Sequence, residues 1–508
     1  MNRRHFLGAL SGVAWAGGGW GPISQGAAAV PLPPSEARDI SSRLELFVDD
    51  WLIDKLRGLD RRLHHPTPQN VALDADKPWE GNGGNYMTVF QDGDRYRMYY
   101  RGVHVVYSQG KFDEPHPEYT CYAESTDGIH WTRPNLGLFE VAGTRENNVI
   151  LTRETGGEAT HNFSPLIDTR PGVVKEERYK ALGGGGKGLI AFGSADGIRW
   201  KKLREQPVIT QGAFDSQNLA FWDTDRAEYR AYFRDFRKGR DIKTCTSKDF
   251  LVWTEPVFLE YTPDRISELY TNQILPYPRA PHLLLGFPTR YTDRGWTTAA
   301  KALPQYDYRR IRASQSQREG TALTDGMFMS SRNRHRFVVW PESFIRPGLK
   351  LKGNWFYGDN YQSLGLVETP SRIEGAPGEL SFYVTESSLQ GESVRWRRYT
   401  LRIDGFVSVH AESTGGEMIT RPIRFTGKQL VMNYSTSIAG GVRVEIQDAQ
   451  GTPSPGFTLA DGEELYGDSL GQVVSWQKGD DVSSLSGQSV RLRFVMKDAD
   501  LYSIQFRT

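Results

Sequence analysis

Four short stretches of the form Ser-x-Asp-Gly-x-x-Trp, or a close variant, recur along most of the chain. They are STDGIHW (125–131), SADGIRW (194–200), SKDFLVW (247–253) and SRNRHRF (331–337). In such a stretch Asp or Asn bonds nearby backbone amides, Gly accepts a positive φ, and the aromatic ring packs back onto a sheet. Apolar residues alternate ahead of three of them, in DGDRYRMYYR, KEERYKALGG and DRAEYRAYFR. The repeat therefore predicts structural turns between half-buried antiparallel strands.

An asparagine precedes each stretch that we interpret as the innermost strand of a unit. Successive asparagines are 77, 56, 54 and 88 residues apart; they are Asn85, Asn162, Asn218, Asn272 and Asn360. These spacings fit four-stranded units with variable excursions, as in the blades of a β-propeller. We therefore predict an all-β fold with a five-bladed β-propeller. The segment DWLIDKLRGLDRRL (50–63) is the main candidate for a short helix.

The pattern changes near residue 400, where the turn signature stops. Short alternating strands separated by Gly- or Asp-rich turns follow, as in GGVRVEIQDAQG and SVRLRFVMKDADLYSIQFR. About 100 residues of this kind predict a β-sandwich. The predicted domains are the propeller at 44–399 and the sandwich at 400–508.

The first 29 residues have the features of an export signal. Arg3 and Arg4 precede His5-Phe6-Leu7 as in a twin-arginine signal, and small residues end the segment near Ala29. The apolar part is too short and Gly-rich for an ordinary transmembrane helix. We expect export to the periplasm or the extracellular space, with no stable membrane insertion after cleavage.

Charge and cysteine content narrow the classes of partner. The formal net charge is +1, and the chain after residue 29 carries −1, which argues against nucleic acid or an anionic membrane as the main partner. Cys121 and Cys245 fall in blades that are not neighbours, so we predict two free thiols. No CxxC, HExxH, G-x-S-x-G or P-loop motif occurs in its required context, and no D-x-D-x-D calcium loop is present. We expect neither cofactor nor metal, and the sequence does not set the oligomeric state.

Five propeller units followed by a sandwich resemble the glycoside hydrolases of the invertase and levanase type, family 32. The propeller itself also resembles the arabinanases and xylosidases of family 43. The resemblance spans residues 44–508 as an architecture and implies an enzyme that cleaves glycosidic bonds. The three motifs of family 32 are not matched. WEGNGGNY has Glu80 but lacks the Asp-Pro of the W-M-N-D-P-N-G motif. FRDF (233–236) only partly matches the R-D-P motif, and SELYTN only partly matches the E-C motif. The catalytic residues are therefore not carried over by motif.

Position within the units then selects the candidate catalytic residues. Asp215, Glu268 and Asp359 lie just before the innermost strands of successive units, where the leading ends of such strands converge. Glycoside hydrolysis needs two carboxylates across the scissile bond, one of them protonated. We predict Glu268 as general acid and Asp215 or Asp359 as base or nucleophile, the remaining carboxylate tuning the pKa. Each of them alone could equally cap a turn or pair with Arg.

Further residues are candidates for substrate binding at the same end of the propeller. His161 could bind substrate, act as a base or be structural, and Arg290 could clamp a uronate or a sulfated sugar. The five asparagines bond either turns or substrate hydroxyls, with turns favoured. In FRDFRKGRD, Arg234, Asp235, Arg240 and Asp241 form either a substrate subsite or a surface ion-pair network, with the network favoured. The predicted binding set is Glu80, Asn85, His161, Asn162, Asn218, Asn272, Arg290 and Asn360.

Three functions fit these features. The leading hypothesis is an exported glycoside hydrolase with a carbohydrate substrate. The second is a non-catalytic carbohydrate-binding propeller, in which the carboxylates only accept hydrogen bonds from hydroxyl groups. The third is a polysaccharide lyase, in which His161, a Tyr and Arg290 would carry out β-elimination on a uronate. A lyase would show a His-Tyr-Arg cluster without a close carboxylate pair.

Overall fold

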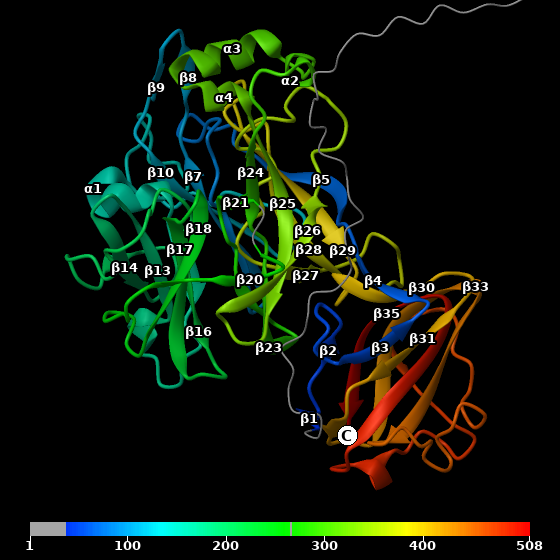
Figure 1. The fold of residues 1–508 in the computed structure, drawn as a ribbon. Coiled ribbons are helices and arrows are strands. Elements are labelled where there is room, and N and C mark those ends of the chain that lie inside the picture. Colours follow the sequence, from blue (N-terminus) through cyan, green and yellow to red (C-terminus); the bar gives the residue numbers. More distant parts are fainter. Residues whose placement is uncertain (1–36, 265–266) are drawn as a thin grey trace, which may run out of the picture.

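The computed structural model describes residues 37–264 and 267–508, and the predicted export signal at 1–29 lies outside them. The described chain is mostly β-structure, with four four-stranded antiparallel sheets in a propeller-like arrangement (Figure 1). The first two are β6 (Thr88–Asp92), β7 (Arg95–Gly102), β10 (Tyr119–Ser125) and β11 (Val149–Leu151), then β12 (Ser164–Ile167), β13 (Tyr179–Gly185), β14 (Gly188–Ser194) and β15 (Lys201–Lys202). The others are β16 (Leu219–Asp223), β17 (Glu228–Phe236), β18 (Arg240–Ser247) and β19 (Val257–Phe258), then β27 (Val367–Thr369), β28 (Glu379–Glu386), β29 (Arg395–Leu401) and β5 (Thr67–Asp74).

The last of these sheets closes on the start of the propeller. Its outer strand β5 precedes the first sheet in the chain, yet it pairs with β29. On the inner side, Thr88 of β6 forms a parallel bridge with Leu364, just before β27. The first and last sheets are therefore neighbours, as a closed ring of sheets requires.

The predicted Ser-x-Asp turns have the expected contacts. In the first turn Ser125 Oγ accepts from the amides of Asp127 and Gly128, at 3.1 and 2.9 Å. Asp127 Oδ1 accepts from the amides of Ile129 and His130 at 2.7 and 2.8 Å, and Gly128 has φ +69°. The same pattern recurs at 194–199 and 247–252. These motifs are structural turns, as predicted.

The fourth unit in sequence is larger than a four-stranded blade. It is a seven-stranded sheet of β20 (Glu260–Thr262), β21 (Glu268–Leu269), β22 (Leu275–Tyr277), β23 (Ala280–Gly286), β24 (Thr289–Asp293), β25 (Ala322–Ser331) and β26 (Arg336–Ile345). Three helices interrupt it: α2 (Thr298–Lys301), α3 (Tyr306–Gln315) and α4 (Gln317–Thr321). They lie at one end of the propeller near the hairpin of β8 (Val106–Ser108) and β9 (Lys111–Asp113) (Figure 1). The structure thus shows four blades of the predicted type and this seven-stranded unit.

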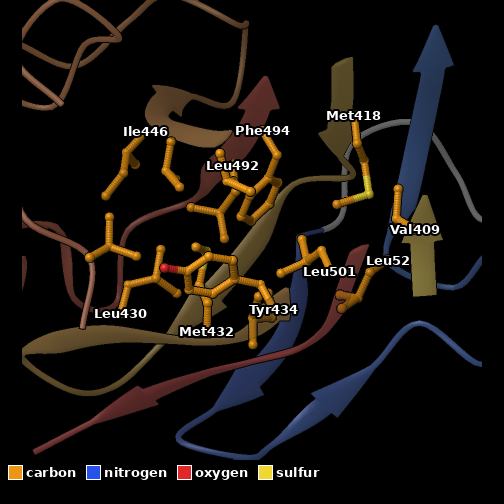
Figure 2. Close-up of a cluster of buried hydrophobic side chains, with 14 of the residues drawn as sticks. Leu52, Val409, Met418, Leu430, Met432, Tyr434, Ile446, Leu492, Phe494 and Leu501 are labelled. Carbon is orange, nitrogen blue, oxygen red and sulfur yellow. The ribbon is translucent and has the colours of Figure 1, made fainter. Parts of the chain in front are cut away.

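Strands from both ends of the chain build the second part of the molecule. A ten-stranded sheet joins the first four strands to those after residue 406 (Figure 1). These are β1 (Arg38–Ser41), β2 (Glu45–Leu46), β3 (Ile53–Arg57), β4 (Leu59–Leu63), β30 (Val407–Ala411), β31 (Gly416–Thr420), β32 (Ile423–Phe425), β33 (Gln429–Asp448), β34 (Asp468–Val473) and β35 (Val490–Arg507). Figure 2 shows side chains such as Leu52, Met418, Met432 and Phe494 converging in its core.

The first strands differ from the prediction in two respects. Residues 50–63 form no helix, because Gly58 turns the chain at φ +67° between β3 and β4. Both strands pair with distant partners, β3 with β31 and β4 with β30. The predicted start of the propeller at residue 44 is therefore too early, since β2, β3 and β4 belong to the ten-stranded sheet. The two-layer sandwich remains a prediction.

Apolar and ionic contacts join the two parts. One buried cluster combines Leu46 and Val407 with Phe287, Phe328 and Phe382 of the propeller sheets. Beside it Arg332 pairs with Glu45 and Asp49, at 2.8 and 2.7 Å. Both cysteines are buried and free, as predicted. Among the described residues, no helix is long and apolar enough to cross a membrane.

Candidate functional site

Three loops that precede strands bring His161 between two carboxylates. His161 ends the 3-10 helix η1 (Gly157–His161), Glu118 directly precedes β10, and Asp215 lies four residues before β16. The ring nitrogen Nδ1 is 2.9 Å from Glu118 Oε1, and Nε2 is 3.1 Å from Asp215 Oδ1. Arg101 pairs with Glu118, and Arg234 of β17 lies 3.4 Å from Asp215 Oδ2. These five residues are the His161 cluster.

Both carboxylates of the cluster are held ionised. Burial alone would raise the pKa of Glu118, but the charge of Arg101 and the hydrogen bond from His161 bring it well below its usual range. Desolvation likewise opposes the ionised form of Asp215, and the contacts with His161 and Arg234 outweigh it, so the pKa of Asp215 is also lowered. Asp215 is the accessible one, with 69% of its side chain exposed against 3% for Glu118. It can act as a base or nucleophile but not as a proton donor at neutral pH.

A group of buried tyrosines adjoins the His161 cluster. It comprises Tyr86, Tyr270, Tyr291, Tyr357 and Tyr361, together with Ala322. The Tyr86 ring lies 5.5 Å from that of His161, and the hydroxyl of Tyr357 donates to that of Tyr270 at 2.7 Å. Burial raises the pKa of Tyr86, Tyr357 and Tyr361 well above its usual value, so these hydroxyls remain protonated.

Two arginines lie against the ring of Tyr270 and hold two carboxylates. Arg234, which contacts Asp215, is 4.9 Å from the Tyr270 centroid, and Arg240 is 5.1 Å from it. Arg240 Nη1 donates to Glu268 Oε2 at 2.8 Å, and the Arg240 backbone amide donates to the same oxygen at 3.1 Å. The Glu268 side chain is 35% exposed. Asp215 and Glu268, both accessible to solvent, are therefore each held by an arginine that lies against the ring of Tyr270.

Asp359 has a different position from the one predicted. The residue is only 1% exposed, and its carboxylate accepts from the backbone amides of Phe356 and Ser388 at 3.0 and 2.9 Å, and from Gln390 Nε2 at 3.2 Å. Burial raises its pKa to about 7, although these donors favour the ionised form. Asp359 thus anchors the loop that carries Tyr357. It cannot meet a substrate in this conformation, so its catalytic assignment is not supported.

Four of the five asparagines are buried and bond backbone carbonyl groups, whereas the half-buried Asn85 bonds a serine side chain. Asn162 bonds Gly184 O and Phe214 O at 2.9 and 2.7 Å, and Asn218 bonds Phe214 O at 3.0 Å. Asn360 donates to Thr324 O at 3.0 Å, and Asn272 to Gln217 O and Tyr232 O at 3.5 Å. Asn85 accepts from Ser388 Oγ at 3.3 Å. Most of them link neighbouring sheets, which agrees with the preference for a structural role.

Glu80 and Arg290 are also committed to structural contacts. Glu80 is fully buried and accepts from Tyr100 at 2.5 Å and from Arg133 at 2.7 Å. Arg290 forms a two-pronged pair with Asp325 on the adjacent strand, at 2.8 and 2.5 Å. Neither is joined to the His161 cluster by a contact that would support the predicted binding role.

Sequence reasoning missed Glu118 and the tyrosines. Glu118 precedes the third strand of its unit, so it has no equivalent in the series of residues before inner strands. Tyr270 lies two residues after Glu268 in SELYTN, and Tyr357 lies two residues before Asp359 in FYGDN, and this proximity was the available signal. Within the described ranges no group of three or more His, Cys, Asp or Glu side chains is arranged to hold a metal.

Comparisons with known proteins leave the family open. No protein-family model matches the chain. Two curated proteins of Mycobacterium tuberculosis, Uncharacterized protein MT1551 and Uncharacterized protein Rv1502, are each 28% identical over 163 residues, or 32% of this chain. The match spans 46% of those relatives, about half their length.

Solved structures show only a weak likeness. An N-acetylgalactosamine deacetylase from F. plautii has a TM-score of 0.39 at 14% identity, covering 68% of this chain and 95% of that one. A fructofuranosidase from Schwanniomyces occidentalis has 0.33 at 10% identity, with coverages of 85% and 96%. A structure from a study of the GH130 mannoside phosphorylases has 0.37 at 12% identity, with coverages of 69% and 95%. Scores below 0.5 do not establish a common fold, so the function has to be argued from the site.

Proposed function

We propose that the protein is a carbohydrate-active enzyme that hydrolyses glycosidic bonds with Asp215 of the His161 cluster and Glu268 as its carboxylates. The observation that carries this proposal is that Asp215 and Glu268 are each held by an arginine that lies against the ring of Tyr270. Two accessible carboxylates are the minimum equipment for glycoside hydrolysis. Asp359 is not one of the proposed catalytic carboxylates, because it is buried.

The two carboxylates take different roles. The lowered pKa of Asp215 suits it to activate a water molecule or to attack the anomeric carbon. Glu268 then donates a proton to the leaving oxygen, and it needs to be protonated before that step. His161 and Arg240 remain partly exposed and offer donors to sugar hydroxyl or carboxylate groups, whereas Arg234 is buried and holds Asp215.

A second candidate, the polysaccharide lyase, is favoured by one observation. His161 lies 5.5 Å from Tyr86, and it shares Asp215 with Arg234, so a His-Tyr-Arg group is present. Arg234 thus provides the arginine of this group, the role that the sequence suggested for Arg290. Tyr86 is buried and its pKa is raised, which makes it a poor base and leaves this candidate second.

The remaining parts of the proposal concern architecture and location. We propose that the seven-stranded sheet takes the place of a fifth blade, between the units of β16–β19 and β27–β29. The ten-stranded part would act as an appended sandwich domain. Export through the twin-arginine-type segment at 1–29 would bring the enzyme to polysaccharides outside the cytoplasm.

One assay separates these functions. The protein is incubated with a panel of neutral and uronate-containing polysaccharides while reducing ends and ultraviolet absorbance are followed together. A hydrolase releases reducing ends without an absorbance change, whereas a lyase produces both. Binding without either signal would overturn both enzyme proposals and leave the non-catalytic carbohydrate-binding propeller.

A further inference from the structure

A groove of about 740 Å³ lies beside the propeller sheets, apart from the His161 cluster. Its walls come from the end of β26 and the loop after it, from β28 and β29, and from the start of β5. Its volume is in the range of sites that hold small molecules or short ligand segments. We call it the basic groove, and its charged lining is Arg346, Lys352, Arg395, Arg397, Glu386 and the buried Asp359.

The charges of the groove are unbalanced. Arg397 Nε pairs with Glu386 Oε1 at 2.7 Å, so the one accessible carboxylate in the lining is already neutralised. Arg395 has only a distant partner, Asp74 at 3.7 Å. Arg346 and Lys352 are exposed and form no ion pair with any residue that the structure describes. Asp359 adjoins the groove but is buried beneath its backbone donors.

The loop that carries the two unpaired cations is held in place by its own contacts. Asn354 donates to Leu349 O at 2.9 Å and also bonds Pro347 O. The indole of Trp355 donates to Gly348 O at 3.0 Å, and the amide of Ser387 donates to Gly353 O at 3.1 Å. Arg346 and Lys352 are therefore presented from a fixed backbone, which lowers the entropy lost when a ligand is bound.

The other lining groups indicate the kind of anion. Tyr399 offers a half-buried aromatic ring, and Gln69 offers an amide group. Aromatic faces and amides suit the apolar face and the hydroxyl groups of a sugar ring, while unpaired cations suit a carboxylate or sulfate on it. We infer that the basic groove binds an acidic saccharide segment, carrying uronate or sulfate groups. The choice of a saccharide rests on the proposed function, whereas the anionic character rests on the groove alone.

The test is isothermal titration calorimetry on the full chain. The probes are an oligogalacturonide, a sulfated oligosaccharide of similar length, a neutral cello-oligosaccharide and inorganic sulfate. We expect one or both acidic oligosaccharides to bind, with an affinity that falls as salt is added. The neutral oligosaccharide and free sulfate are expected to bind at least tenfold more weakly.

Paired variants then place the binding in the groove. Arg346→Gln with Lys352→Gln is expected to weaken acidic oligosaccharides about tenfold, or about 1.4 kcal/mol. Lys201→Gln with Lys497→Gln removes the same charge from exposed positions elsewhere and should leave the affinity unchanged. Unchanged binding in the groove variant, an equal loss in the control, or equal binding of free sulfate would overturn the inference.

The outcome is distinguishable from that of the proposed function. Asp215→Asn should lower the rate of cleavage by about 10²–10⁴-fold and keep the binding in the groove. Groove-dependent binding in a protein that cleaves nothing would support the inference while the proposed enzyme fails. If the protein cleaves polysaccharide but the groove variant does not change its affinity for acidic oligosaccharides, the proposed function stands and the inference about the groove fails.

Discussion

Arg234 and Arg240 lie against the same tyrosine ring, 4.9 and 5.1 Å from the centroid of Tyr270, and each holds one accessible carboxylate. The two arginines come from the adjacent strands β17 and β18, and the ring comes from the seven-stranded sheet. The positions of Asp215 and Glu268 are therefore set by a contact between two sheets. The predictions below test this arrangement and the framework that supports it.

Neutralising either carboxylate should remove activity and leave the fold intact. We expect Asp215→Asn and Glu268→Gln each to lower the rate by about 10²–10⁴-fold, the range for a lost acid or base. Because both side chains are accessible, the midpoint of thermal unfolding should change little. Glu205→Gln, at an exposed carboxylate paired with Lys202, is the matched control. Wild-type rates in both variants would contradict the assignment of the pair.

The ring of Tyr270 should matter more than its hydroxyl. Tyr270→Phe loses the hydrogen bond with Tyr357 but keeps the face on which Arg234 and Arg240 lie, so we expect activity within a few-fold of wild type. Tyr270→Leu removes that face, and both arginines lose their support. We expect a loss of about 10- to 100-fold in kcat, consistent with misplaced catalytic groups. Equal activity of the two variants would show that the ring does not position the carboxylates.

Asp359 should affect stability and its pH dependence. Burial raises its pKa to about 7 from 3.8, so the folded protein keeps this proton at pH values where the unfolded chain has lost it. The resulting contribution to stability is present below pH 4 and is lost as pH rises through 7. Asn cannot titrate and cannot accept from all the donors, so Asp359→Asn should be less stable than wild type at pH 5.

The difference in stability between Asp359→Asn and wild type should then become smaller as pH rises from 5 to 8. Thermal unfolding at both pH values measures it, with Asp60→Asn, at an exposed position, as the control. A gap that is constant or widens with pH would contradict the raised pKa. A loss of activity larger than the loss of folded protein would return Asp359 to the list of catalytic candidates.

Much of the framework follows from local sequence. The Ser125–Asp127 turn and its repeats use side chains to bond amides within three residues, so the motif alone specifies the contacts. The alternation of apolar residues likewise predicted the sheets. The pairing of β3 and β4 with β31 and β30 involves residues more than 300 positions apart. A run such as 50–63, which contains apolar residues at helical spacing, does not reveal such a partner.

The site could be predicted only in part, because it too depends on contacts between residues far apart in the sequence. Asp215 and His161 were selected by position, but their direct contact depends on how two units face each other. The exposure of Asp359 depends on the loops at 356–359 and 387–390, which close over its carboxylate. Glu118 bonds His161 from a third unit and shares no repeat position with it. Sequence spacing identifies which residues approach one end of a propeller, and packing decides which of them remain accessible.

The Arg332 network should control the stability of the junction between the two parts of the molecule. Arg332 pairs with Glu45 and Asp49, whose side chains are 0% and 8% exposed, and it stacks on Trp51 at 4.2 Å. Arg332→Gln removes the cation that two buried carboxylates share, although Glu45 keeps its contact with Arg43 at 3.2 Å. Loss of one partner from a buried ion pair costs about 3–5 kcal/mol in comparable sites. Arg336→Gln, which breaks an exposed pair with Glu260, should change stability little.

The pH dependence of the same variant provides an independent check. Burial would raise the pKa of Glu45, but the charge of Arg332 and the contact with His282 lower it to about 2 from 4.5. This contribution to stability is present above pH 4.5 and is lost as pH falls through 2. Without Arg332 the depression is smaller, so the stability gap in urea unfolding should shrink between pH 7 and pH 3. A gap that stays constant over this range would show that Glu45 does not depend on Arg332.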